Sequence, residues 1–169
     1  MKMTDLLKIT ICMALVLLAG CSKPEETNKE TIKKVLEQEL TAPDKELTEI
    51  TQDPEKNEKL DQYLEKNYGP YFTEAGLQNF IAAYGGTQYH SYADHSGYKL
   101  SFKDVTFEQD ESDSNLYTFA ARVGYMKSGE EEKTANVEGK VIFSAEEKGQ
   151  IEAFQYGNDD GLSDILRKQ

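Results

Sequence analysis

The sequence predicts an α+β fold in which N-terminal helices pack on a curved four-stranded antiparallel sheet. Apolar residues recur every three or four positions in residues 29–84 and every second position in residues 98–156. The chain has 169 residues, about the length of one domain, and 38% of them are hydrophobic. Ten Tyr and seven Phe supply enough apolar bulk for a folded core. We therefore expect a single domain over residues 29–169.

The first helix is predicted to begin at Thr27, because Glu30 follows at the spacing of a capping box. Its apolar stripe is formed by Ile32, Val35, Leu36 and Leu40. Pro43 ends this helix, because proline cannot continue it. The stretch 43–51 contains only two apolar anchors, Leu47 and Ile50, so it is either a loop or a single helical turn.

Two more helices follow before the sheet. The second is predicted to start at Asp53-Pro54, where Asp can cap and Pro fits the first turn, and to stop at Gly69-Pro70. Thr73 is predicted to cap the third helix, which Gly85-Gly86 ends. The apolar faces of these two helices are formed by Leu60, Tyr63, Leu64 and Tyr68, and by Leu77, Phe80, Ile81 and Tyr84.

Alternating apolar residues predict four strands in the second half, over residues 98–107, 117–125, 137–143 and 151–156. The alternation changes phase near Lys103-Asp104, which predicts a β-bulge in the first strand. Small residues at inward positions predict a strongly bent sheet, namely Ala121, Gly139 and Ala153. Apolar residues in the tail 161–169 predict a closing turn of helix.

This element order, with Tyr71-Phe72-Thr73-Glu74-Ala75-Gly76-Leu77 at the junction of helices and sheet, resembles the NTF2-like (cystatin-like) superfamily. The resemblance covers residues 29–160 and implies a cone-shaped space between the sheet and the helices. In that superfamily the cone holds a ligand or, in some members, a catalytic Asp-His pair. Relatives often pair through the exposed sheet face, which implies a homodimer as one possible assembly.

Residues 1–20 have the pattern of a targeting segment, because Lys2 and Lys8 precede an apolar run over residues 9–20. As a helix this run reaches only about 18 Å, short of the roughly 30 Å hydrocarbon core of a bilayer. Leu18-Ala19-Gly20-Cys21 resembles the lipobox of bacterial lipoproteins. That resemblance implies cleavage before Cys21 and attachment of fatty acyl (palmitate-type) chains to it. The alternative is an ordinary secretory signal with an incidental cysteine.

Lipidation of Cys21 implies a protein held at the extracytoplasmic face of the cell membrane, with residues 21–28 as a solvated tether. Cys12 leaves with the signal peptide, so no disulfide is expected in the mature chain. The formal net charge is −12, which disfavours binding to nucleic acid. We expect the lipid anchor to be the attachment to the membrane.

His90 and His95 bracket Asp94 and are the two histidines of the sequence. They could form a metal site or a general-base pair with Asp94. A polar loop is the favoured interpretation, because the stretch lies between helix and sheet and its spacing suits neither a strand face nor a helix face. We expect no metal and no cofactor, and we favour a turn over a calcium site at Asn158-Asp159-Asp160-Gly161.

Aromatic residues around the histidines suggest a ligand-binding lip, formed by Tyr84, Tyr89, His90, Tyr92 and His95. Core packing by some of these tyrosines is the simpler explanation. The inward strand positions carry no carboxylate or imidazole; they are Tyr117, Phe119, Ala121, Val123, Tyr125, Val137, Val141 and Phe143. Such a lining suits an apolar ligand better than proton transfer.

Three functions follow from these observations. The favoured one is a membrane-anchored, non-enzymatic lipoprotein that binds a small apolar ligand or an envelope protein. The second is an NTF2-like enzyme that uses Asp94 with His90 or His95. The third is an accessory structural subunit of an envelope, secretion or conjugation complex.

Overall fold

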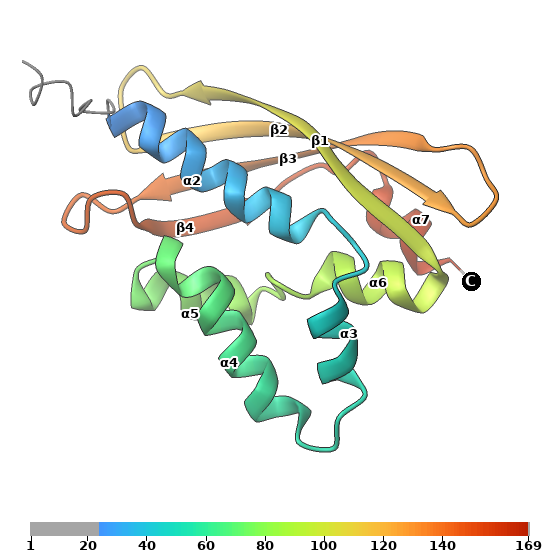
Figure 1. Ribbon diagram of the computed structural model, residues 1–169. Coiled ribbons are helices and arrows are strands. Elements are labelled where there is room, and N and C mark those ends of the chain that lie inside the picture. The colour runs from blue at the N-terminus through green and yellow to red at the C-terminus, as the bar shows by residue number, and fades with distance from the viewer. Residues whose placement is uncertain (1–23, 169) are drawn as a thin grey trace, which may run out of the picture.

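The computed structural model describes residues 24–168, so the signal segment, the lipobox and Cys21 lie outside the described residues. The helical elements are α2 (Pro24–Glu39), α3 (Lys45–Thr51), α4 (Lys56–Tyr68), the 3-10 turn η1 (Gly69–Tyr71), α5 (Glu74–Ala82), α6 (Gln88–Ser96) and α7 (Leu162–Arg167). The strands are β1 (Tyr98–Gln109), β2 (Leu116–Lys127), β3 (Lys133–Phe143) and β4 (Ile151–Tyr156). The predicted α+β class, with helices before a four-stranded antiparallel sheet, is confirmed (Figure 1).

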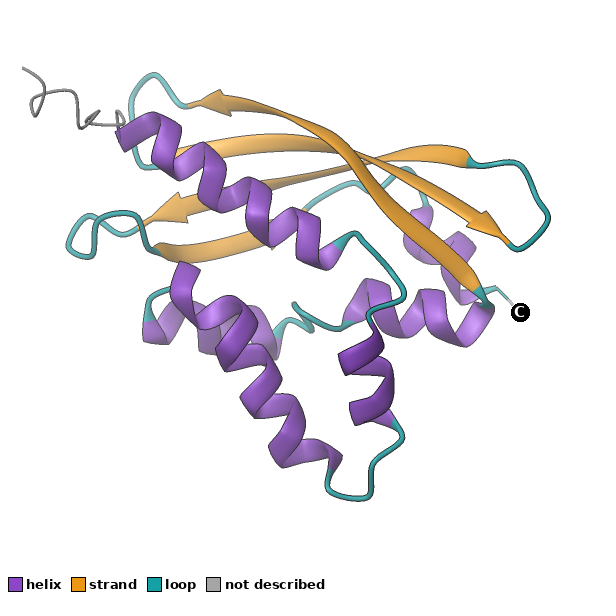
Figure 2. Ribbon diagram, in the orientation of Figure 1, coloured by secondary structure: helices purple, strands orange, loops and turns teal. Residues whose placement is uncertain are grey.

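The four strands pair in chain order as an antiparallel meander, β1-β2-β3-β4. The register of β1 shifts between Phe102 and Asp104, which confirms the predicted bulge. Gly139 lies opposite Phe119, and a Cβ at Gly139 would lie 2.5 Å from the ring of Phe119. Glycine at this position therefore leaves room for the aromatic ring where the sheet bends (Figure 2).

The inward alternation predicted for β4 is wrong. A register shift between Ile142 and Phe143 places Ile151 and Phe154 in the core, where they are 0% and 7% exposed. Ala153 instead pairs with Ile142, which is 40% exposed, and so lies on the outer face. The extra residue of the bulge reverses the side-chain alternation, and no local sequence pattern indicates a bulge at this point.

Helix α2 lies along the inner face of the sheet, and α4, α5 and α6 gather on the same side (Figures 1 and 2). One continuous core joins the stripe of α2 to the inward side chains of β2 and β3. The β2 and β3 residues of this core are at most 5% exposed: Tyr117, Phe119, Ala121, Val123, Ala135, Val137, Val141 and Phe143. Side chains therefore fill the space beneath these two central strands. No helix of the described residues is long and apolar enough to cross a membrane.

Three helical segments differ from the sequence prediction: the start of α2, the stretch 43–51 and the start of α4. Helix α4 begins at Lys56, with Glu55 at its N-cap, and not at Asp53-Pro54. Helix α2 begins at Pro24 instead of Thr27, so residues 24–28, expected to be part of the tether, form its first turn and bury Asn28. Residues 45–51 form helix α3, which Asp44 caps by accepting a hydrogen bond from the Leu47 N–H at 2.8 Å. The cap was available to sequence reasoning, since Asp precedes the first helical residue.

The segment expected to be a polar loop is helix α6, and that prediction is wrong. Tyr89, His90 and Ala93 form its buried face, and Gly97 ends it in the left-handed conformation at φ 70°. The helix is stabilised by burial of this narrow face against α7 and β1, and its own sequence is mostly polar. The predicted closing helix at the C-terminus is confirmed as α7.

Helix α5 packs unusually close to the edge of β4. Thr73 caps it as predicted, with its hydroxyl accepting from the Gly76 N–H at 3.0 Å. A Cβ at Gly76 would lie 2.4 Å from the carbonyl oxygen of Ile151. The missing side chain allows the helix to cover the edge of β4, which would otherwise expose unpaired backbone groups.

Candidate functional site

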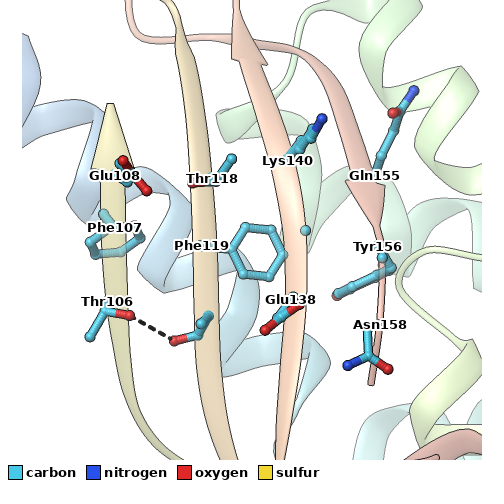
Figure 3. A pocket seen from close by; sticks show the side chains of 13 residues that line it. Thr106, Phe107, Glu108, Thr118, Phe119, Glu138, Lys140, Gln155, Tyr156 and Asn158 are labelled. Atoms are coloured by element: carbon cyan, nitrogen blue, oxygen red, sulfur yellow. Dashed lines mark hydrogen bonds between the residues drawn. The ribbon is translucent and has the colours of Figure 1, made fainter. Parts of the chain in front are cut away.

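The candidate site is a groove of about 800 Å³ on the outer face of the sheet, the face opposite α2 (Figure 3). Its outward-facing lining comes from all four strands and the segment after β4: Thr106, Glu108, Thr118, Ala120, Glu138, Lys140, Gln155 and Asn158. These residues alternate with the inward core residues, so the pairing register of the strands fixes their positions.

Two parallel rows of mostly polar side chains cross the sheet within this groove. In the first row Thr118 lies opposite Lys140, and Lys140 lies opposite Gln155 (Figure 3). In the second row Ala120 lies opposite Glu138. Ala120 carries the smallest side chain among these positions.

Charges of both signs line the groove without neutralising each other. Lys140, Glu108 and Glu138 are exposed and take part in none of the ion pairs of the described residues. The Lys140 ammonium can bind a carboxylate, and the two glutamates can bind an ammonium or guanidinium group. Such a surface suits a partner that carries both charges.

A second polar cluster lies inside the fold around Glu39, whose side chain is fully buried. The Tyr68 hydroxyl donates to Glu39 Oε1 at 2.9 Å, and the Tyr156 hydroxyl donates to Oε2 at 3.1 Å. The backbone N–H of Gly86 also donates to this carboxyl group. Burial raises the pKa of Glu39 from 4.5 to about 7, although the three donors favour the charged form and oppose the rise.

The cluster continues through aromatic contacts to the C-terminal helix. The rings of Tyr156 and Tyr89 meet edge to face with centroids 5.5 Å apart, and the Tyr89 hydroxyl donates to Asp159 Oδ2 at 3.4 Å. Asp159 also accepts from the backbone N–H groups of Gly161 and Ser163 at 3.1 and 2.9 Å. Its carboxylate thereby caps α7, a structural role for the acidic turn that had suggested calcium. No group of three or more metal-ligating side chains occurs among residues 24–168.

His90 is buried between α2, α3 and α6, and is 5% exposed. Its Nε2 lies 2.8 Å from the carbonyl oxygen of Gln38, so Nε2 carries the proton and Nδ1 has a free lone pair. Nδ1 has no hydrogen-bond partner in the described part of the chain. Burial lowers the pKa of His90 and keeps the ring neutral.

Asp94 and His90 line the same small cavity, one turn apart on α6. This cavity has a volume of about 20 Å³, which is room for about one water molecule. His95 is exposed and does not line it. Asp94 and His90, the residues of the enzyme alternative, therefore line one cavity, but it is too small for an organic substrate.

The predicted aromatic lip is not gathered on one surface. Tyr84 is 72% exposed with a positive φ of 64°, whereas Tyr89 is 2% exposed and belongs to the core. Tyr92 is half-buried, with the Arg167 guanidinium 5.4 Å from its ring centroid. Core packing, the simpler explanation, therefore accounts for Tyr89. Tyr84 is exposed on the surface.

Sequence reasoning missed Glu39, although the pattern of the first helix contained it. Glu39 follows Leu36 by three positions and Val35 by four, so it falls on the apolar stripe. A carboxyl group on such a stripe is either exposed at the margin or buried with hydrogen-bond partners. Tyr68 and Tyr156, predicted only as core residues, are those partners.

No protein-family model matches the chain, and no curated protein matches it either. Among solved structures, the chain is similar to a protein from Jannaschia sp. CCS1 described as a SnoaL-like polyketide cyclase. The two share 13% sequence identity, with a TM-score of 0.44, over 88% of this chain and 95% of the other. This level of likeness carries no argument about activity.

Proposed function

We propose that this chain is a lipoprotein whose Cys21 is lipidated and whose NTF2-like domain binds an envelope protein at the outer face of its sheet. The domain lies at the extracytoplasmic face of the cell membrane and performs no catalysis. The groove lined by Thr118, Lys140 and Gln155 is the docking surface.

The sequence around Cys21 supports the anchor. A short basic start and an apolar run lead to the small residues before the cysteine, as in bacterial lipoproteins. Two acyl chains suffice for stable attachment, because each buried methylene contributes about 0.8 kcal/mol. Helix α2 begins at Pro24, three residues after Cys21, so at most about 11 Å of chain separates the two. The anchored domain is therefore held close to the lipid surface.

The contrast between the two faces of the sheet is the observation that carries the binding function. The inner face, which was expected to hold a small apolar ligand, is filled by its own core. The outer face is hollowed and lined with hydrogen-bonding and charged groups. A protein surface offers matching charges and amides over such an area, whereas a small apolar ligand gains little there. We therefore favour an envelope protein over an apolar ligand as the partner.

The enzyme alternative has less support. It needs a substrate beside Asp94 and a histidine, and the cavity that His90 and Asp94 line holds about one water molecule. The accessory-subunit alternative uses the same docking groove and differs only in the permanence of the complex. A second copy of this chain is a further possible occupant of the groove.

Photo-crosslinking in the native host tests the docking surface. Thr118 and Gln155 are replaced, one at a time, by the photoreactive residue benzoylphenylalanine, and exposed Lys34 on α2 is the control position. We expect one discrete envelope protein crosslinked from both groove positions and not from the control. Lys140→Glu should abolish that product, because it reverses the charge offered to the partner. A product unaffected by Lys140→Glu, or formed equally from Lys34, would reject the groove.

Fractionation and intact-mass measurement test the anchor. Wild-type protein should lie in the membrane fraction and begin at an acylated Cys21, because the resemblance implies cleavage before that residue. Cys21→Ala should release the protein to the medium or leave an unprocessed precursor. Unchanged fractionation, or an unmodified terminus at another residue, would discard the lipoprotein proposal.

A further inference from the structure

We propose that gain and loss of a proton by the buried Glu39 changes the outer groove, with Tyr156 as the link between the two. The regulatory meaning rests on the proposed function, since the groove is the proposed docking surface. The coupling itself belongs to this chain and can be measured without any partner.

Tyr156 is held from inside the fold by Glu39. Its hydroxyl donates to Glu39 Oε2 at 3.1 Å, while Tyr68 on α4 donates to Oε1 at 2.9 Å. No lysine or arginine pairs with this carboxyl group among the described residues. Its ionised form is therefore stabilised only by neutral donors.

The end of β4, which carries Tyr156, also builds one wall of the groove. Gly157 N–H donates to the Glu138 carbonyl at 2.7 Å, and Glu138 N–H donates to the Asn158 carbonyl at 2.8 Å. The side chains of Gln155, Glu138 and Asn158 line the groove around these bonds (Figure 3). The same short segment thus contacts Glu39 on one side of the sheet and forms the groove on the other.

The two protonation states of Glu39 require different hydrogen bonds. The ionised carboxylate only accepts, and its bonds from tyrosine hydroxyls are shorter than those between neutral groups. The neutral acid carries a proton that must itself be donated, so one of its hydroxyl partners has to become the acceptor. Loss of the proton therefore pulls Tyr156 and Tyr68 towards Glu39, and β4 moves with Tyr156.

The other titratable groups that face this cluster are phenols, one histidine and two carboxylates. Burial raises the pKa of Tyr68, Tyr89 and Tyr156, so these phenols stay neutral at physiological pH. Burial lowers the pKa of His90 on α6, which favours its neutral form. The remaining groups facing the cluster are Tyr63, whose pKa is also raised, and the carboxylates of Asp44 and Asp159, which accept from Tyr63 and Tyr89.

Nuclear magnetic resonance of the isotope-labelled full chain in detergent micelles tests this coupling between pH 5 and pH 9. The side-chain carboxyl carbon of Glu39 reports its own titration, and the backbone amides of Gly157, Asn158 and Glu138 report the groove. We expect the chemical shifts of the Glu39 carboxyl carbon and of these amides to change with one common midpoint near pH 7. Glu39→Gln should abolish that midpoint at the groove amides. Glu37→Gln, on the exposed side of the same helix, should leave it unchanged.

Tyr156→Phe provides a second test if Glu39→Gln does not fold. It removes the hydroxyl that joins Glu39 to β4 and keeps the ring, so Glu39 should still titrate while the groove amides lose the common midpoint. Groove amides whose chemical shifts do not change while Glu39 titrates would overturn the coupling. A Glu39 side chain that keeps one charge state from pH 5 to pH 9 would overturn it as well. Either result leaves the crosslinking test of the docking surface untouched, so the two proposals fail separately.

Discussion

Replacing Glu39 by glutamine should change how the stability of the domain depends on pH. Glutamine has nearly the same shape, stays neutral at every pH, and can accept from one tyrosine hydroxyl while donating to the other. The wild-type carboxyl group is fully buried and loses its proton near pH 7. The comparison therefore isolates the free-energy cost of a buried negative charge.

The size of the effect follows from the change in pKa between the unfolded and folded chain. Folding raises the pKa of Glu39 from 4.5 to about 7. At about 1.4 kcal/mol for each pH unit, full ionisation costs the folded state about 3 kcal/mol. Below pH 4.5 Glu39 is protonated in both the folded and the unfolded chain, so it does not reduce the free energy of unfolding. Wild-type stability falls as the pH rises from there through 7, and the loss levels off above it.

Urea unfolding at pH 5 and pH 8 measures this difference for wild type, Glu39→Gln and the exposed control Glu37→Gln. The stability of wild type relative to Glu39→Gln should fall by about 2 to 3 kcal/mol between the two pH values. In thermal unfolding this corresponds to roughly 5–10 °C for a domain of this size. His90 acts in the opposite direction, because its lowered pKa costs stability as the pH falls below 6.5, but it is present in all three proteins.

A constant difference between wild type and Glu39→Gln at both pH values would refute the argument. It would mean that Glu39 keeps one charge state throughout, or that water reaches it. A pH-dependent difference of equal size in Glu37→Gln would show that general surface charge, and not burial, produces the effect.

Four further substitutions test a helix cap, a close backbone approach and an exposed ion pair. Thr73→Ala removes the cap of α5 and should cost about 1 kcal/mol in urea unfolding, whereas Thr73→Ser should cost less. Gly76→Ala forces a methyl group to 2.4 Å from the Ile151 carbonyl, so it should cost about 2–3 kcal/mol or prevent folding; a neutral result would mean that α5 shifts freely. Arg122→Ala breaks an exposed ion pair with Asp104 and should leave the melting temperature unchanged within error, because solvent screens such pairs.

Much of the fold was predictable because its signals are local. A few neighbouring residues are enough to predict the alternating runs of β1 to β3, the bulge beside Lys103 and the cap at Thr73. Helix α6 was not predictable in this way, because its burial depends on α7 and β1, which are distant in the chain. The phase of β4 failed for a similar reason, since its bulge is a property of the pairing with β3.

The candidate site was predicted less well than the fold. The alternation predicted which strand residues face inward, but a hollow on the opposite face depends on the three-dimensional shape of the sheet, which no local pattern contains. The histidine segment was considered as a catalytic or metal site because histidine is rare in this chain. In the structure His90 instead forms a hydrogen bond with the backbone of α2. Glu39 was overlooked because glutamate is common, and its partners Tyr68 and Tyr156 are 29 and 117 positions away.

Helix α2 is a single continuous helix that runs from near the proposed lipid anchor to the buried Glu39. It has 16 residues, a length of about 24 Å, and carries Glu39 at its last position. Its first residue lies three positions after the cysteine that we propose is acylated. The helix therefore places the end nearest the proposed anchor and the buried carboxyl group at opposite ends of one continuous element.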